Sequence, residues 1–366
     1  MNDRLIFAIP RLLPMLLCLG FAASASAQPV PLLFESDDVL QLAMEVDFDT
    51  LCRPSEDPDC DFVVTEFTYE DDSGETRTVP VGIQRRDGWR AQQTNCQVPT
   101  LFVRFSDEDT AGTPFEGQNL LALTSHCGKG YRPENVPSRR LPDQFESYVI
   151  NEYLGYRLYN LVTDASLKVR LVKMRYQHPE NSRLDFSNDA FFSEHFSSLA
   201  ERLSANITPP GSFELARLDF ATADRMAIFH YMIGNTDWSI QDQENVALLE
   251  TADGKLLPVA YDFDMSGLVS AHYARPAAGL PVRNVKQRYF MGFCHPYSDW
   301  DALFEEFAAL RDPSLKLVSD TPGLGRGDRR VSGAYLDSFF RMLESTEARK
   351  NNISDACLPI EDQQAP

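Results

Sequence analysis

Residues 62–69 read Phe-Val-Val-Thr-Glu-Phe-Thr-Tyr, and residues 79–84 read Val-Pro-Val-Gly-Ile-Gln. Both runs are rich in β-branched and aromatic side chains and alternate in part, which is typical of strands. The polar stretch 70–75 contains Gly74 and provides a turn between the two runs. Residues 101–105 and 120–125 continue the same pattern. The sequence therefore predicts a β-rich region over residues 40–127.

Helical patterns follow this region. Pro142 stands where a helix would begin, and the apolar spacing predicts a long helix over residues 142–163 that carries Glu152 among aromatic side chains. A strand is expected at 167–176, helices at 189–204 and 219–233, and a hairpin at 246–249 and 256–263. Gly234 is placed to end the helix before it in a left-handed conformation. Further helices are expected at 299–310 and 331–343.

These elements predict an α+β protein in two parts. The first, residues 28–180, is a β-rich N-terminal lobe that includes the long helix 142–163. The second, residues 181–366, is a mostly helical C-terminal lobe that carries an acidic loop and hairpin. No linker rich in Ser, Gly or Pro separates the two parts, so we expect them to share an interface.

The first residues have the pattern of an export signal. Arg4 and Arg11 precede or flank an apolar run, and Ala25-Ser26-Ala27 offers the small residues at which such leaders are cut. Residues 1–27 are therefore expected to be a signal peptide, and the mature protein is expected in the periplasm or outside the cell. The apolar run is short and contains prolines, which disfavours a membrane span, so we expect no stable membrane insertion after cleavage.

The cysteines fit an oxidising compartment. Of the seven cysteines, Cys18 lies in the leader, and an even number remains. Many pairings are compatible with this set, and the sequence does not choose among them. The simplest arrangement joins neighbours: Cys52 with Cys60, Cys96 with Cys127, and Cys294 with Cys357.

The net charge of −20 excludes classes of partner. Nucleic acids and anionic membrane surfaces attract proteins with a basic face, so neither is an expected partner. Arg85, Arg86 and Arg90 form a small basic group after a candidate strand. We interpret them as salt-bridge partners in this acidic protein, with phosphate contact as the alternative.

The candidate chemistry lies in two segments. Asp237 follows the helix that ends near Gly234, and Asn245 begins the hairpin that ends in Asp262 and Asp264. On a strand, residues two apart share a face, so the last two carboxylates are expected to point the same way. Several carboxylates in one place repel one another unless a cation lies among them, and oxygen ligands suit divalent cations.

This order of residues suits phosphoryl transfer. One carboxylate orients or deprotonates the accepting hydroxyl, while an amide and a second carboxylate hold the metal ion that bridges nucleotide phosphates. Asp237 is the expected base, and Asn245 with Asp262 and Asp264 are the expected metal ligands. The acceptor would be a hydroxyl of a protein or small molecule.

The same residues resemble a known family. Asn235-Thr236-Asp237 with Asn245, followed by Tyr261-Asp262-Phe263-Asp264, is similar to the catalytic loop and metal-binding segment of atypical kinases of the HipA and CotH (spore-coat kinase) type. The similarity covers roughly residues 80–300 and extends to exported bacterial proteins of unassigned function. It implies a two-lobed atypical protein-kinase-like fold and ATP with Mg²⁺ or Mn²⁺ as cofactors.

The resemblance also implies a binding pair for the nucleotide. Glu152 resembles the helix glutamate that pairs with a nucleotide-binding lysine, and Lys173 is the expected lysine, with Lys168 or Arg104 as alternatives. No glycine-rich phosphate loop precedes these basic residues. Asn245 also lies farther beyond Asp237 than the corresponding residue does in protein kinases.

These departures keep a second hypothesis open. The chain could be a non-catalytic pseudokinase, or an envelope or binding protein stabilised by Ca²⁺ held by Asp237, Asp262 and Asp264. Hard oxygen ligands suit calcium as well as magnesium, so the ligand set alone does not choose.

Overall fold

The computed structural model describes residues 30–57, 59–71, 73–92, 95–96, 98–128 and 142–359. The leader expected at residues 1–27 lies outside this part of the chain, and the expected domain boundaries remain predictions. In the described part, no helix combines the length and the apolar character needed to cross a membrane.

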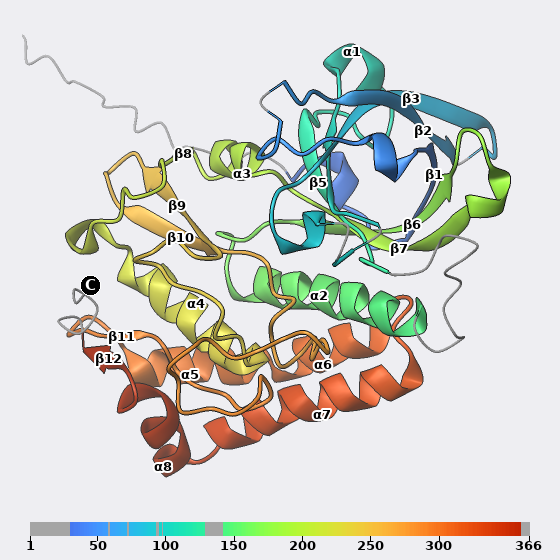
Figure 1. Ribbon diagram of the computed structural model, residues 1–366. Helices are drawn as coiled ribbons and strands as arrows, with labels where there is room; N and C mark the ends of the chain where they lie inside the picture. The colour runs from blue at the N-terminus through green and yellow to red at the C-terminus, as the bar shows by residue number, and fades with distance from the viewer. Residues whose placement is uncertain are drawn as a thin grey trace, which may run out of the picture.

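Seven strands close into a barrel in the order β1-β2-β3-β4-β5-β7-β6 (Figure 1). The first five, which run from residue 40 to residue 124, fall in the expected β-rich region. The barrel closes because β1 pairs with β2 on one side and, in parallel, with β6 on the other. Its strands are β1 (Leu40–Glu45), β2 (Val63–Glu70), β3 (Thr76–Arg85), β4 (Leu101–Arg104), β5 (Leu120–Thr124), β6 (Val169–Gln177) and β7 (Phe186–Ser193).

The expected two-lobed, atypical protein-kinase-like fold is therefore wrong. The β-rich part is a closed barrel rather than one lobe of a two-lobed fold with a helical partner. The strand that the sequence reading missed is β7, because residues 189–204 were expected to form a helix. Instead β7 pairs with both β5 and β6, and only the short α3 (Phe196–Arg202) is helical. Strand pairing over this distance overrides the local helical pattern.

The barrel encloses its own apolar core. Val172, Met174 and Tyr176 of β6 point inward and join a cluster that includes Phe67, while Val169 and Leu171 belong to the second core outside the barrel. This alternation follows from the period of two along a strand. The strand continues past Val172 to Gln177, so the charged side chains of opposite parity, Lys173 and Arg175, lie on the outer face.

Helix α2 (Pro142–Val162) lies between the barrel and the remaining helices (Figure 1). Its aromatic and aliphatic side chains share one core with α4 and with the later helices. This helix is the one expected over residues 142–163, and its position places Glu152 at the junction of the barrel and the helical part. The other helices are α1 (Asp107–Thr110), α4 (Phe220–Ile233), α5 (Trp300–Ala309), α6 (Arg311–Asp320), α7 (Arg326–Leu343) and α8 (Thr346–Arg349).

A small sheet packs on the same core. The expected hairpin is present as β9 (Val246–Thr251) and β10 (Leu256–Ala260), with β8 (Ala205–Ile207) as a third strand. Gly254 at its turn has φ 82°, which glycine adopts readily. A two-stranded sheet of β11 (Phe293–Cys294) and β12 (Leu358–Pro359) lies near the end of the described chain.

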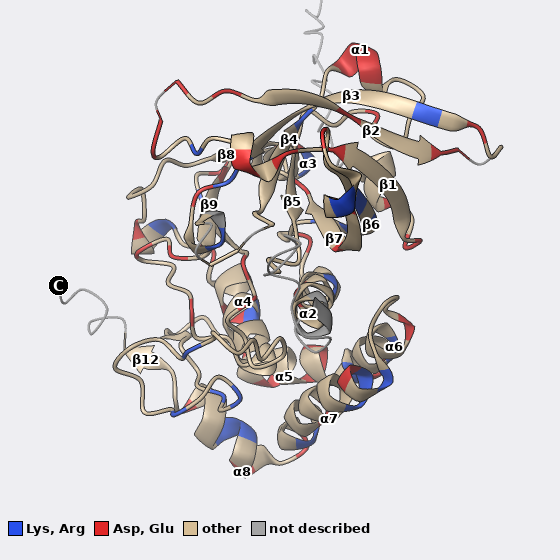
Figure 2. Cartoon of the chain, turned by 45° about the vertical axis from the view of Figure 1, so that its right-hand side comes forward, with Lys and Arg blue, Asp and Glu red and all other residues tan. Residues whose placement is uncertain are grey.

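All three neighbouring cysteine pairs are disulfides: Cys52–Cys60, Cys96–Cys127 and Cys294–Cys357. The simplest pairing is thus confirmed. Figure 2 shows acidic positions on α1 and on several loops, in keeping with the net charge of −20.

Candidate functional site

The loop that presents Asp237 begins where α4 ends. Gly234 has φ 66° and ends the helix in the left-handed conformation, as expected. A side chain is excluded at this position because a Cβ atom would lie 3.0 Å from the carbonyl oxygen of Val285 and against the Tyr335 hydroxyl. The carbonyl oxygen of the Asn235 side chain then accepts a 3.0 Å hydrogen bond from the Asp237 N–H. The backbone thus turns sharply after α4 and leaves Asp237 half-buried in the loop.

The second acidic segment begins after β10, which ends at Ala260. Asp262 and Asp264 were expected on the strand itself, but the chain has already left it. Asp262 has φ 59°, so the simple alternation of a strand does not set the direction of its side chain. Its N–H donates a 2.9 Å hydrogen bond to the hydroxyl oxygen of Tyr156 on α2, which fixes the backbone there.

Backbone hydrogen bonds join the two acidic segments directly. The N–H groups of Gly267 and Leu268 donate to the carbonyl oxygens of Gly234 and Ile233, each over 3.0 Å. The Tyr261 N–H donates to the carbonyl oxygen of Asn245, also over 3.0 Å. The loop after α4 and the segment after β10 therefore lie side by side.

Asn245 is oriented by Asp237. Its side-chain nitrogen donates to the Asp237 carboxylate over 3.0 Å and to the Asp237 carbonyl oxygen over 2.8 Å. The amide oxygen of Asn245 makes neither of these bonds, because both use the nitrogen. Asn245 has φ 51°, a conformation that asparagine tolerates better than most residues.

Arg90 is the residue that gathers the remaining carboxylates. Its Nη2 atom lies 2.9 Å from Glu152, 2.7 Å from Asp264 and 3.2 Å from Asp262, and its Nε atom donates to Asp264 over 3.1 Å. The Arg90 side chain is only 12% exposed and that of Glu152 only 4%. One guanidinium group thus neutralises acidic groups from α2 and from the segment after β10.

The segment around Arg90 is held from both sides. The Trp89 ring lies 4.9 Å from the ring of Tyr273, whose hydroxyl donates to Asp264 over 2.9 Å. Farther along, Cys96 is bonded to Cys127. Arg90 is therefore fixed at the acidic cluster by ring packing, by a disulfide and by its own ion pairs.

The charges of the cluster act on each other. Burial raises the pKa of Asp237 to about 6, and the negative charges of Asp262 and Asp264 add to the rise, while the Asn245 amide opposes it. Burial also raises the pKa of Glu152, and its ion pair with Arg90 opposes that rise. Burial lowers the pKa of Arg90, but the adjacent carboxylates outweigh it and raise the pKa well above its ordinary value, so the guanidinium stays charged.

Lys173 has a different partner from the one expected. It forms an ion pair with Asp189 across β6 and β7, with 3.3 Å between nitrogen and oxygen, while Glu152 pairs with Arg90. Of the alternatives, Arg104 lies near Asp61, and the backbone N–H of Lys168 donates to Glu194. Arg90 was not expected at the site, although its expected role in salt bridges matches these contacts. The basic residues 85–90 stand out in the sequence, but Asp264, the partner of Arg90, lies 174 residues away.

Across the part of the chain that the structure describes, no group of three or more His, Cys, Asp or Glu side chains is arranged to hold a metal ion. Here the carboxylates surround a guanidinium group. The oxygen atoms of Asn245, Asp262 and Asp264 nevertheless have the chemistry that Mg²⁺, Mn²⁺ and Ca²⁺ prefer.

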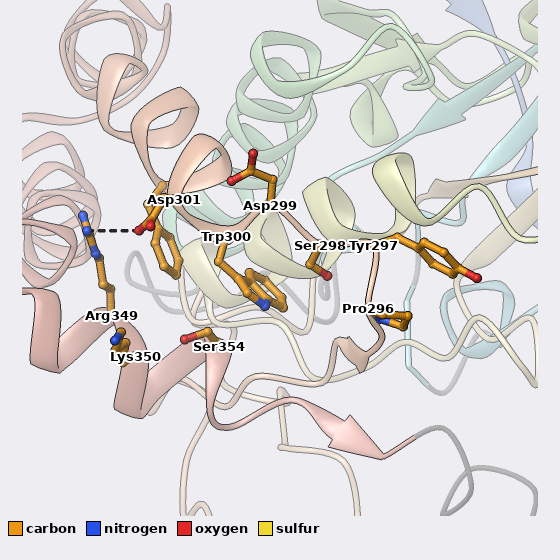
Figure 3. A pocket seen from close by; sticks show the side chains of 10 residues that line it. Pro296, Tyr297, Ser298, Asp299, Trp300, Asp301, Arg349, Lys350 and Ser354 are labelled. Carbon is orange, nitrogen blue, oxygen red and sulfur yellow. Dashed lines mark hydrogen bonds and ion pairs between the residues drawn. The ribbon is translucent and has the colours of Figure 1, made fainter.

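A separate cavity of about 590 Å³ lies beside α5 (Figure 3). Three of its charged groups have partners: Arg349 pairs with Asp301 over 3.3 Å, and Asp299 accepts a hydrogen bond from the N–H of Ala302 at the start of α5. The cavity therefore presents neither a free carboxylate at Asp299 nor an uncompensated guanidinium at Arg349.

Ser298, which lines this cavity, belongs to a cluster with His295 and Asp224. The Nε2 atom of His295 lies 2.9 Å from Asp224 and 3.0 Å from the Ser298 hydroxyl. The Tyr297 N–H donates to Nδ1, so Nδ1 is the acceptor and Nε2 carries the proton. A nucleophilic serine needs an unprotonated nitrogen next to its hydroxyl. The unprotonated Nδ1 lies 3.5 Å from the Ser298 hydroxyl and already accepts the Tyr297 N–H, so this cluster lacks the geometry of a hydrolytic triad.

His230 lies in the core beneath the Asp237 loop, and its burial should make the folded protein less stable in acid. It is 0% exposed and stacks on Trp238 with 4.6 Å between ring centres. Burial lowers its pKa to about 3, below the unfolded value of about 6.5, so the unfolded chain binds the extra proton between these two pH values. The folded state should lose about 2 kcal/mol at this residue between pH 7 and pH 5.

Urea unfolding of the wild type and of His230→Phe at both pH values measures this loss. His126, with a pKa also lowered by burial to about 3, contributes a similar loss in both proteins and serves as an internal reference. A variant with the same pH dependence as the wild type would contradict the assignment.

Comparisons with known proteins do not assign this chain to a family. No protein-family model and no curated protein matches this chain. Three chains among the solved structures match it. One is the proinflammatory kinase CtkA of Helicobacter pylori, with a TM-score of 0.34 and 11% identity over 70% of this chain and 89% of that chain. A likeness this weak carries no argument about function and does not show membership of the HipA or CotH families.

Proposed function

We propose that this protein is a metal-dependent phosphotransferase that acts on a hydroxyl group of a protein or small molecule. One observation carries the proposal: the Asn245 amide holds Asp237, and the backbone of the same loop is bonded to the segment of Asp262 and Asp264. Phosphoryl transfer requires a carboxylate that orients a hydroxyl next to an oxygen-rich metal site. The loop carries Asp237 as the proposed base, and the adjoining segment carries the oxygen atoms that we propose as metal ligands.

Asp237 would be the base. A pKa of about 6 leaves most of the carboxylate ionised at neutral pH and makes it a better proton acceptor than an ordinary aspartate. Its hydrogen bond to Asn245 fixes one oxygen, Oδ2, and so orients the carboxylate. In the proposed reaction, Asp237 accepts the hydroxyl proton while the hydroxyl oxygen bonds to phosphorus and the donor loses its terminal phosphoryl group.

Asn245, Asp262 and Asp264 would hold Mg²⁺ or Mn²⁺, and ATP is the proposed donor. When bound, the metal ion would neutralise negative charge on the phosphates. Arg90 contacts both aspartates, so a cation has to share them with this guanidinium group or displace it. Arg90, in the segment after β3, would act as a positioning residue because it contacts both aspartates, and Glu152 on α2 would hold Arg90 in place.

The second candidate is a non-catalytic binding or envelope protein, with Ca²⁺ as its alternative ligand. The observation that favours it is the position of Arg90, which already neutralises the carboxylates without a metal ion. A protein that needs only charge balance at this point would require no further ligand.

We also propose that the protein lies in the periplasm or outside the cell. Three disulfides fit an oxidising compartment such as the periplasm or the extracellular space. A kinase in such a place would need an external supply of nucleotide or would have to act before export.

Thermal unfolding with added ligands separates the two candidates. For the phosphotransferase, ATP with Mg²⁺ or Mn²⁺ should raise the melting temperature more than either metal ion alone, because the ligand binds only the folded state. For the alternative, Ca²⁺ alone should raise it and ATP should add nothing. A melting temperature that does not respond to nucleotide with any of these ions would reject the proposed function.

A further inference from the structure

The three arginines near the end of β3 have different partners. Arg85 is buried and donates from Nη2 to the carbonyl oxygen of Phe48 over 2.6 Å. Arg90 is surrounded by carboxylates. Arg86 lies between them in sequence, and within the described residues its side chain has neither an ion pair nor a hydrogen bond. Two of the three guanidinium groups are therefore committed to the fold, and the third is available.

The position of Arg86 is defined by its backbone and by a ring. Its N–H donates to the carbonyl oxygen of Thr100 over 3.0 Å, and its guanidinium carbon lies 5.4 Å from the centre of the Phe102 ring. A guanidinium group that rests on an aromatic face keeps its edge free for hydrogen bonds. Arg86 is half-buried, so this edge is held in a restricted place rather than in bulk water.

A row of rings connects Phe102 to the acidic segment. Phe102 lies 6.3 Å from His195, and Phe196 lies 5.2 Å from Tyr261, the residue before Asp262. His195 and Phe196 are neighbours in the chain, with 6.4 Å between their ring centres. Arg86 therefore lies at one end of this row of rings, and Asp262 follows the ring at the other end in the chain.

The charges agree with this geometry. Desolvation and then the Asp264 carboxylate raise the pKa of Asp262, although 44% of its side chain is exposed, and the positive charges of Arg90 and Arg86 oppose the rise. Burial lowers the pKa of His195, and the charge of Arg86 lowers it further. Within the described residues, Arg86 makes no ion pair with Asp262, so its guanidinium group is not neutralised by that carboxylate.

We propose that Arg86 binds a phosphate group of the donor, an inference that rests on the proposed function. The guanidinium edge matches two phosphate oxygens, and the Phe102 ring supports it from behind. Arg90 is less suited to this contact because its Nε and Nη2 groups are bonded to carboxylates. The class of ligand is a phosphate ester or polyphosphate, which would place negative charge between Arg86 and the metal site.

The neighbouring carboxylates add a condition. Without a cation, Asp262 and Asp264 repel a polyphosphate, so binding at Arg86 depends on a divalent metal ion. Isothermal titration of the disulfide-bonded, mature protein with inorganic triphosphate, with and without Mg²⁺, measures this directly. The wild type should bind triphosphate in the presence of Mg²⁺ only.

Arg86→Gln should weaken this binding by roughly tenfold to a hundredfold, the usual effect of losing a hydrogen bond between charged groups. Arg86→Lys should retain part of the affinity, and it decides the question if the glutamine variant does not fold. The matched control is Arg104→Gln, which removes the same charge from an arginine that also lies over a phenylalanine ring, 4.2 Å from the centre of Phe62.

Three outcomes overturn the inference: no triphosphate binding by the wild type with Mg²⁺, unchanged affinity in Arg86→Gln, or an equal loss in Arg104→Gln. The last outcome would indicate a general effect of charge. A separate assay of phosphoryl transfer keeps this result distinct from the proposed function. Binding through Arg86 without any transfer would reject the phosphotransferase and keep the phosphate contact, whereas transfer that is unaffected in Arg86→Gln would reject the contact alone.

Discussion

Asp237→Asn is expected to lower the rate of phosphoryl transfer by about a hundredfold to ten-thousandfold, the usual contribution of a general base. The variant keeps the size and hydrogen-bonding shape of the side chain, and its amide oxygen can still accept the hydrogen bond from Asn245. It removes only the group that accepts the proton. The measurement is the steady-state rate with ATP and Mg²⁺, together with the melting temperature.

The fold should survive this change. Burial and the nearby Asp262 and Asp264 disfavour an ionised carboxylate at position 237, so a neutral amide should not lower the melting temperature at neutral pH. Asp242→Asn is the matched control, because Asp242 is exposed on the same loop and, in the described part of the chain, its side chain bonds only to Ser239. The catalytic role of Asp237 is lost if both variants retain the wild-type rate.

Arg90→Met is expected to destabilise the protein by about 3–5 kcal/mol, the usual cost of removing one partner from a buried ion pair. Methionine leaves the carboxylates of Glu152 and Asp264 without their common partner, and the Glu152 side chain is only 4% exposed. A divalent cation should restore part of this loss because it can replace the missing positive charge. Urea unfolding with Mg²⁺, with Ca²⁺ and with a chelator measures both effects.

Arg225→Met provides the comparison. Among the described residues Arg225 forms an ion pair with Glu306 alone, and its side chain is 34% exposed, so the change should cost about 1 kcal/mol or less. It should also be insensitive to metal ions. If Arg90→Met is no more costly than Arg225→Met, the ion pairs around Arg90 do not stabilise the fold. If metal ions fail to stabilise Arg90→Met, these carboxylates are not a cation site.

Several features could be predicted from the sequence because their causes are local. The end of α4 at Gly234 follows from glycine's freedom in the left-handed conformation, and the hairpin of β9 and β10 follows from its Asp253-Gly254 turn. The pairing of neighbouring cysteines was also confirmed, and a short loop explains it for Cys52–Cys60, which are only 8 residues apart. The loop of Asp237 was also recognisable because it directly follows a helix with a clear pattern, whereas Asp262 and Asp264 were expected on the strand and lie just after it.

Other features depended on contacts between distant parts of the chain. The helix expected at 189–204 is largely the strand β7, because β5 and β6 both pair with it and so close the barrel. Local propensity does not contain that information. The expected lobe was therefore replaced by a closed barrel, which sets Lys173 on the outer face of β6, where it pairs with Asp189.

The sequence by itself determined which residue types could carry chemistry: an acidic loop, an acidic segment and a short basic group. The tertiary structure decided how the basic group was divided, because only the folded chain brings Arg90 to carboxylates on α2 and after β10 and leaves Arg86 beside Phe102. Ion pairs form between side chains that are close in space, and a separation of 174 residues leaves no trace of that closeness in the sequence.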